Sequence, residues 1–108
     1  MNNIETTLLI SPEITKNDLT KIVKMFEKLV VDQGGKIIGK EDWGLRDLAY
    51  KINSLKKSFY YFYQINIESH KVQTLIKMMS QNEEIIRYLF VKVNEHDKLP
   101  TKILKSNE

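Results

Sequence analysis

The side chains that could carry out catalysis or bind a metal are few and scattered along the chain. The two histidines, His70 and His96, lie far apart in the sequence with no carboxylates at matching spacing, and we expect both at the surface. Because the sequence contains no cysteine, thiolate metal sites and disulfides are excluded. The histidines therefore point to neither a metal site nor a catalytic pair.

Two pairs of adjacent carboxylates remain, Glu41-Asp42 and Glu83-Glu84. Neighbouring side chains of a strand point to opposite faces, so the first pair cannot easily converge on one ligand. The second pair falls at an expected helix-to-strand turn, where solvated side chains are typical. Gly34-Gly35 follows a helical pattern instead of preceding one, so it is no phosphate-binding loop. The sequence predicts no catalytic residues, no metal and no cofactor.

Charge is concentrated in one short segment. The chain of 108 residues has a formal net charge of +3. Residues 46–57 contain Arg46, Lys51, Lys56 and Lys57 against Asp47 alone, which equals the excess of the whole chain. These cations are either phosphate contacts or an ordinary solvated edge.

Hydrophobic periodicity predicts a strand, helix, strand, strand, helix, strand order. The expected elements are a strand over 4–10, a helix from Thr15 to the residues before Gly34, a strand over 36–52 bulged near Gly39 or Gly44, a polar loop over 53–58, a strand over 59–67, a helix from Ser69 to Asn82 and a strand over 85–93. Thr15 and Ser69 are the expected N-caps, and Gly34 is the expected C′ residue. The six residues of this loop are too many for a tight two-residue turn.

This order indicates an α+β, ferredoxin-like sandwich (βαββαβ): a four-stranded antiparallel sheet with two helices on one face. Alternation places Ile86, Tyr88 and Phe90 toward the helices. The open face should carry Tyr60, Phe62, Arg87 and Leu89. An uncovered sheet face with two aromatics is suited to binding.

The aromatic run at 59–63 invites comparison with RNA-recognition motifs, which stack bases on aromatics of a sheet. The alternative is that alternate members are core residues and the others face a protein partner. We favour the alternative, because the characteristic Lys/Arg-Gly-aromatic pattern of such motifs is absent. Trp43 is similarly favoured as a packing anchor over a platform for stacked bases.

We expect one domain over residues 1–93 and a flexible polar tail over 94–108, in which Leu99, Ile103 and Leu104 form a possible docking patch. The absence of cysteine allows a reducing cytoplasm.

The run Gly44-Leu45-Arg46-Asp47-Leu48-Ala49-Tyr50-Lys51-Ile52-Asn53 resembles the signature of the bacterial small-subunit ribosomal protein six family. Ile10-Ser11-Pro12, Gly34-Gly35 and Ile86 to Lys92 match flanking features of that family in the same order, and the resemblance covers about residues 4–93.

The resemblance implies a cytoplasmic structural protein of the small ribosomal subunit. It implies binding to the central domain of small-subunit rRNA together with ribosomal protein eighteen of the subunit. Because the core pattern is complete without a cysteine or a cluster of metal ligands, we expect the isolated protein to be a monomer. The candidate RNA contacts are Arg46, Lys51, Lys56, Lys57, Arg87 and Lys92. The candidate partner contacts are Trp43, Tyr60, Phe62, Leu89 and Leu99.

Lys51 stands where the family often has proline, and Asp47 stands where a basic residue is common. These two differences leave the expected fold unchanged. Two other functions occur on the same fold. An acylphosphatase-like enzyme would need an arginine in a phosphate loop after the first strand, but residues 11–15 contain an acid and no arginine. A small-molecule-sensing domain is usually fused to an enzyme, and no second domain is present in this sequence.

Overall fold

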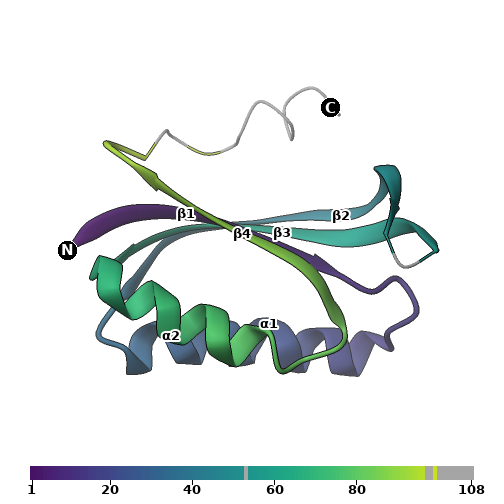
Figure 1. Ribbon diagram of the computed structural model, residues 1–108, viewed down its shortest axis with the longest axis horizontal. Helices are drawn as coiled ribbons and strands as arrows, with labels where there is room; N and C mark the ends of the chain where they lie inside the picture. Colours follow the sequence, from purple (N-terminus) through teal and green to yellow (C-terminus); the bar gives the residue numbers. More distant parts are fainter. Residues whose placement is uncertain (53, 97–98, 100–108) are drawn as a thin grey trace.

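The computed structural model describes residues 1–52, 54–96 and 99. It contains β1 (Asn2–Ile10), α1 (Lys16–Asp32), β2 (Lys36–Ile52), β3 (Leu55–Ile67), α2 (Ser69–Met79) and β4 (Ile85–Val93). The strands form one sheet in the order β2-β3-β1-β4, and each neighbouring pair is antiparallel. Both helices lie on the same side of this sheet (Figure 1). The predicted ferredoxin-like sandwich is confirmed.

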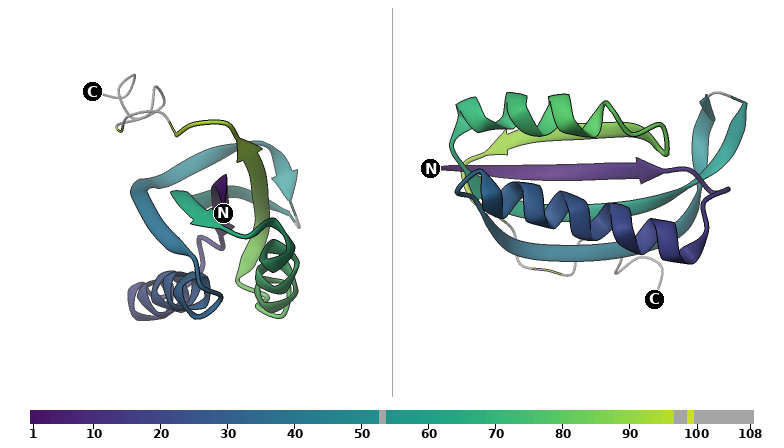
Figure 2. Two further views of the ribbon diagram at one scale, coloured as in Figure 1. Left: turned by 90° about the vertical axis from the view of Figure 1, so that its left-hand side faces the viewer. Right: turned by 90° about the horizontal axis from the view of Figure 1, so that it is seen from below.

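The core lies between the helices and one face of the sheet. Alternate residues of β1 and β3 point into it, and Phe26 of α1 packs against Tyr63 with ring centroids 4.8 Å apart. Seen along the strands, the two helices lie side by side beneath the sheet (Figure 2). Apolar burial between these two layers stabilises the fold. Within the described residues, no helix is both long and apolar enough to cross a membrane.

The ends of α1 follow local chemistry. Thr15 is the N-cap, and its hydroxyl accepts a hydrogen bond from the backbone N–H of Asp18. Gly34 has a φ of +80°, which a residue with a side chain rarely adopts. The N–H groups of Gly34 and Gly35 bond to the carbonyls of Val31 and Val30, which is the Schellman arrangement. Both predicted ends of this helix are confirmed.

The cap of α2 differs from the prediction. Ser69 is the first helical residue, and the N-cap position is taken by Glu68, whose side chain makes no capping bond. Asn2 of β1 supplies the missing acceptor, because its side-chain oxygen takes hydrogen bonds from both the N–H and the hydroxyl of Ser69. The helix ends at Met79, earlier than the expected Asn82. A cap from a distant strand cannot be recognised in the local sequence.

The long hairpin of β2 and β3 also departs from the prediction. Ile52 pairs with Leu55, so residues 53–54 alone connect the strands, and the expected loop over 53–58 is wrong. Ser54 has a φ of +69°, the left-handed conformation that tight hairpin turns require. Polar and charged residues can form strand at the exposed end of a hairpin, because their backbone groups pair across the two strands. The expected bulges are confirmed, since the register shifts between Ile37 and Gly39 and between Asp42 and Gly44.

A further register shift decides which residues of β4 face the core. The pairing with β1 slips between Leu9 and Ile10, so Ile85 enters the core in place of the expected Ile86. Tyr88 and Phe90 pack against the core as predicted. Arg87 and Leu89 therefore lie on the open face.

Candidate protein and nucleic-acid interfaces

A stack of three aromatic rings lies on the open face of the sheet. Trp43 is the extra residue of the second β2 bulge, and its indole lies over Phe62 at 5.3 Å between centroids with an interplanar angle of 12°. Tyr60 lies 6.3 Å from the same ring. The indole N–H donates to a carboxylate oxygen of Glu41 at 2.9 Å, which fixes the orientation of the ring. The bulge thus covers part of the open face with a residue of the same chain.

Phe62 is consequently less accessible than the alternation of β3 suggested. Its side chain lies on the open face as expected, but only 8% of the residue is exposed because Trp43 covers it. A partner on this face would meet Trp43 and the half-buried Tyr60 before it met Phe62. Sequence periodicity assigns a face but does not show that a bulged neighbour covers it.

Strand β4 provides two exposed apolar residues on this face. Leu89 is 59% exposed, and Val91, two positions on and therefore on the same side, is 44% exposed. Val91 was not among the residues selected from the sequence, although the alternation that selected Leu89 applies to it as well. β4 is an edge strand, so this apolar pair lies at one border of the sheet.

The basic residues of segment 46–57 lie on the far part of the β2–β3 hairpin. Arg46 donates from Nε to the carbonyl of Trp43 at 3.0 Å, and its guanidinium lies 6.0 Å from the indole centroid. Lys57 forms an ion pair of 3.8 Å with Asp47 across the hairpin, while Lys51 and Lys56 are exposed. Arg46 therefore joins the aromatic stack to the basic hairpin.

The structure separates the two candidate cations of β4. The Arg87 guanidinium lies 5.6 Å from the ring centroid of Tyr50, so this residue reaches the hairpin although the two are distant in sequence. Lys92 pairs with Ile4, a core residue, and therefore lies on the helix side of the sheet. The structure brings five of the six candidate cations to the hairpin and leaves Lys92 apart.

The first residues after β4 are held on the open face, where the chain turns over the side of the sheet away from the helices (Figure 1). The side chain of His96 is only 10% exposed, so the expectation of a surface histidine is wrong. Its Nε2 lies 3.0 Å from the carbonyl oxygen of Ile65. Leu99 lies against Gly39 of β2. His96 and Leu99 are thus packed on the sheet, which does not fit a freely moving tail at these two positions. The rest of the expected tail after His96, with Ile103 and Leu104, lies outside the described residues.

A charged cluster on the helix side is structural. Glu27 of α1 accepts hydrogen bonds of 2.8 Å from the ammonium of Lys40 and from the hydroxyl of Tyr63. Burial acts to raise the pKa of Glu27, but these two hydrogen bonds outweigh it and hold the pKa below the ordinary 4.5. Burial and the bond to Glu27 raise the pKa of the Tyr63 hydroxyl far above its ordinary range. The cluster ties α1 to β2 and β3.

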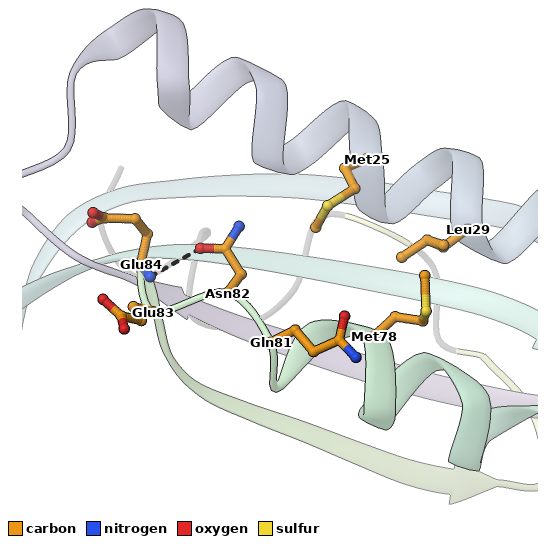
Figure 3. Close-up of a pocket in the computed structure, with 7 residues that line it drawn as sticks. All are labelled: Met25, Leu29, Met78, Gln81, Asn82, Glu83 and Glu84. Atoms are coloured by element: carbon orange, nitrogen blue, oxygen red, sulfur yellow. Dashed lines mark hydrogen bonds between the residues drawn. The ribbon is translucent and has the colours of Figure 1, made fainter.

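The helix side also contains a cavity of about 470 Å³ between α1 and α2. Methionine and leucine side chains line one end, and the turn that contains Glu83 and Glu84 lines the other (Figure 3). Both carboxylates are exposed, as expected for solvated turn residues. Glu41 and Asp42 pair with Phe62 and Tyr61 and so lie on opposite faces. No group of three or more potential metal ligands occurs in the part of the chain that the structure describes.

Comparison with known proteins agrees with this architecture. Residues 3–92 match the family model described as ribosomal protein S6. The chain is 43% identical over 106 residues to the small ribosomal subunit protein bS6 of Rickettsia prowazekii, which covers 98% of this chain and 88% of that protein. It is 41% identical over the same length to the bS6 protein of Rickettsia felis.

The crystal structure of 30S ribosomal protein S6 from Thermotoga maritima has the same fold. It superposes with a TM-score of 0.82 over 85% of this chain and 87% of that one, at 22% identity. This structural likeness shows a shared fold. Membership of a family is shown by the match of the family model over most of the chain and by the sequence identity to the curated relatives. This chain belongs to the ribosomal protein S6 family, whose members are structural components of the small ribosomal subunit and not enzymes.

Proposed function

We propose that this small-subunit protein binds the central domain of small-subunit rRNA together with ribosomal protein eighteen of the same subunit. The observation that supports the proposal is the proximity of two different surfaces. An aromatic and apolar face lies beside a basic hairpin, and Arg46 contacts Trp43 where the two meet. One surface suits a protein, the other a phosphate backbone.

The protein partner would occupy the open face. Trp43, Tyr60 and Leu89 are its direct contacts, and Phe62 supports Trp43 from beneath. An apolar patch with aromatic residues and few charges is typical of the core of a protein interface. Base stacking on the sheet is less suited to this geometry, because Phe62 is already covered by Trp43.

The rRNA would be contacted by the hairpin. Arg46, Lys51, Lys56 and Lys57 supply the positive charge, and Arg87 adds to it beside Tyr50. Lys92 lies on the other side of the sheet, so we do not include it in this RNA-binding surface. Because affinity for nucleic acid depends on the number of phosphates neutralised, a chain with a net charge of +3 should bind tightly only with a basic partner beside it.

The experiment is a binding measurement with the purified chain, ribosomal protein eighteen and an rRNA fragment of the central domain. We expect the pair to bind the fragment at least about tenfold more tightly than either protein alone, which corresponds to about 1.4 kcal/mol of coupling. Equal affinity of the isolated chain and the pair would contradict the proposal. Sizing of the isolated chain should show a monomer. We also expect the protein to fractionate with cytoplasmic ribosomes.

A matched pair of substitutions tests the protein surface. Leu89→Asp places a charge at a residue that is 59% exposed on the open face, and Val31→Asp does the same at a residue that is 60% exposed on α1. Only Leu89→Asp should weaken binding of the protein partner, since a buried unpaired charge is unfavourable in an interface. Equal effects of the two variants would show that the open face is not the docking surface.

A further inference from the structure

Three residues that follow β4 contact three different elements of the sheet. The backbone carbonyl of Asn94 accepts a hydrogen bond of 2.9 Å from the side-chain amide of Asn3 in β1. His96 contacts β1 and β3, and Leu99 reaches β2. We call Asn94, His96 and Leu99 the C-terminal anchor residues. Their contacts fall on β1, β3 and β2, which follow one another in the sheet away from the edge strand β4.

His96 is the polar centre of this arrangement. Its Nε2 donates to the carbonyl oxygen of Ile65 at 3.0 Å, and its Nδ1 lies 3.5 Å from a carboxylate oxygen of Glu5. Ile65 pairs with Ile37, next to the first bulge of β2. A backbone carbonyl in a sheet that bonds to a side chain outside the sheet is a specific attachment point. The small exposed fraction of the imidazole, 10%, shows that His96 is packed against the sheet and offers little surface to a partner.

Gly39 provides the space for Leu99. A Cβ atom on this glycine would lie 2.7 Å from Cδ1 of Leu99 and 2.8 Å from the side-chain oxygen of Gln64. Both distances are shorter than side-chain contacts allow, so a larger residue at position 39 would push Leu99 outward. The glycine therefore forms a shallow seat in which the leucine lies on the open face.

We propose that His96 is a positioning residue that holds Leu99 on the sheet, so that Leu99 and Trp43 together form the outer layer of the partner-docking surface. The inference rests on the proposed binding of ribosomal protein eighteen. Gln64, beside Leu99, is two positions from Phe62 in β3 and lies on the same side of the strand. The seat of Leu99 is therefore continuous with the ring stack of Trp43 and Phe62.

Holding the leucine in place before association favours binding, because the complex does not then have to order this segment. The partner would meet apolar side chains fixed at two points along β3, and would complement them with apolar side chains of its own. His96 itself would act only through Leu99. Its removal and the removal of the leucine should then affect the same contact.

The test measures the affinity of the full chain for ribosomal protein eighteen by calorimetry. We expect His96→Ala and Leu99→Ala each to weaken binding by about three- to tenfold, the range that one hydrogen bond or one partly buried side chain produces. The double variant should be little weaker than either single variant, because both remove the same contact. His96→Gln, which keeps one side-chain N–H donor, should recover part of the affinity. His70→Ala, at an exposed histidine of α2, is the matched control and should bind as the parent does.

A second measurement tests the contact between Leu99 and Gly39 in the isolated chain, without a partner. In the isolated, isotope-labelled chain, a nuclear Overhauser effect should connect the Leu99 methyl groups with the α-protons of Gly39, and it should disappear in His96→Ala. Its absence in the parent chain would overturn the inference, as would tighter or unchanged partner binding by His96→Ala. If the parent chain does not bind the partner while the Overhauser effect is present, the proposed function fails and the docking role of Leu99 fails with it.

Discussion

The two faces of the sheet bury aromatic residues by different means. On the helix side, Tyr63 is fully buried against Phe26 of α1, and its hydroxyl is held by Glu27. On the open side, Phe62, the adjacent residue, is covered by Trp43 from a bulge of the neighbouring strand. A helix completes the first face, whereas the second face is covered in part by single side chains. The comparison indicates that the helix face supports the fold and the open face is available for assembly.

The largest expected effect is on the helix side. Tyr63→Ala should lower the free energy of unfolding by about 3–5 kcal/mol, because it leaves a large cavity and removes a hydrogen bond to Glu27. Tyr60→Ala, on the open face, should lower it much less, since Tyr60 is half-buried and its ring lies 6.3 Å from Trp43. Urea denaturation measures both. Similar losses would remove the distinction between the two faces.

The basic hairpin should influence RNA binding and not folding. Lys51→Glu with Lys56→Glu reverses two exposed lysines and should weaken binding of the rRNA fragment by the pair about tenfold or more. It should also lower the salt dependence, by a slope of about 0.9 or less for each phosphate contact. Arg46 is left unchanged because it also holds the carbonyl of Trp43.

The control variant reverses the charge of Lys28 and Lys77, which are exposed on the two helices. Filter binding at several salt concentrations gives both affinity and slope. Unchanged values in the hairpin variant, or equal changes in the control, would show that the hairpin lysines are ordinary surface residues.

Trp43 should contribute to both stability and assembly. Trp43→Ala uncovers Phe62 and should lower the free energy of unfolding by about 1–2 kcal/mol, from lost ring contacts and lost burial. It should also weaken partner binding. Trp43→Phe keeps an aromatic ring over Phe62 and should recover most of the stability. Thermal denaturation that does not distinguish the alanine from the phenylalanine variant would argue against the stack as a support of the open face.

The smallest effect concerns the pH dependence of the helix side. Because the folded pKa of Glu27 lies below its ordinary value, this carboxylate stabilises the fold above about pH 4.5, and its contribution is lost as the pH falls through the lowered pKa. Glu27→Gln should therefore show a shallower loss of stability than the parent between neutral and acid pH. Melting temperatures across this range test the expectation. Parallel curves for the two proteins would contradict it.

The sequence predicted those features that depend on local chemistry. Helix α1 has a capping hydroxyl at Thr15 and a left-handed glycine at position 34, and both signals lie within the helix's own segment. The alternation of β3 likewise assigned Tyr61 and Tyr63 to the core. Where a local signal decides the conformation, reading it from the sequence suffices.

Features that depend on distant contacts were missed. Asn2 of β1 caps α2, which is distant in sequence, and the ring of His96 packs on the sheet at the carbonyl of Ile65. The cover over Phe62 depends on the direction in which the bulge turns Trp43. Arg87 joins the basic hairpin through Tyr50, a contact between strands that are not neighbours in the sheet. In each case the residue type was visible in the sequence but its partner was not.

The central claim is that protein and RNA bind to different surfaces, and side-chain footprinting with hydroxyl radicals tests it most directly. Trp43, Tyr60 and Leu89 report on the open face, and Tyr50, which is 62% exposed, reports on the hairpin. Addition of ribosomal protein eighteen should protect the first three, and subsequent addition of the rRNA fragment should protect Tyr50. Protection of Tyr50 by the protein alone, or of the open face by RNA alone, would contradict the account.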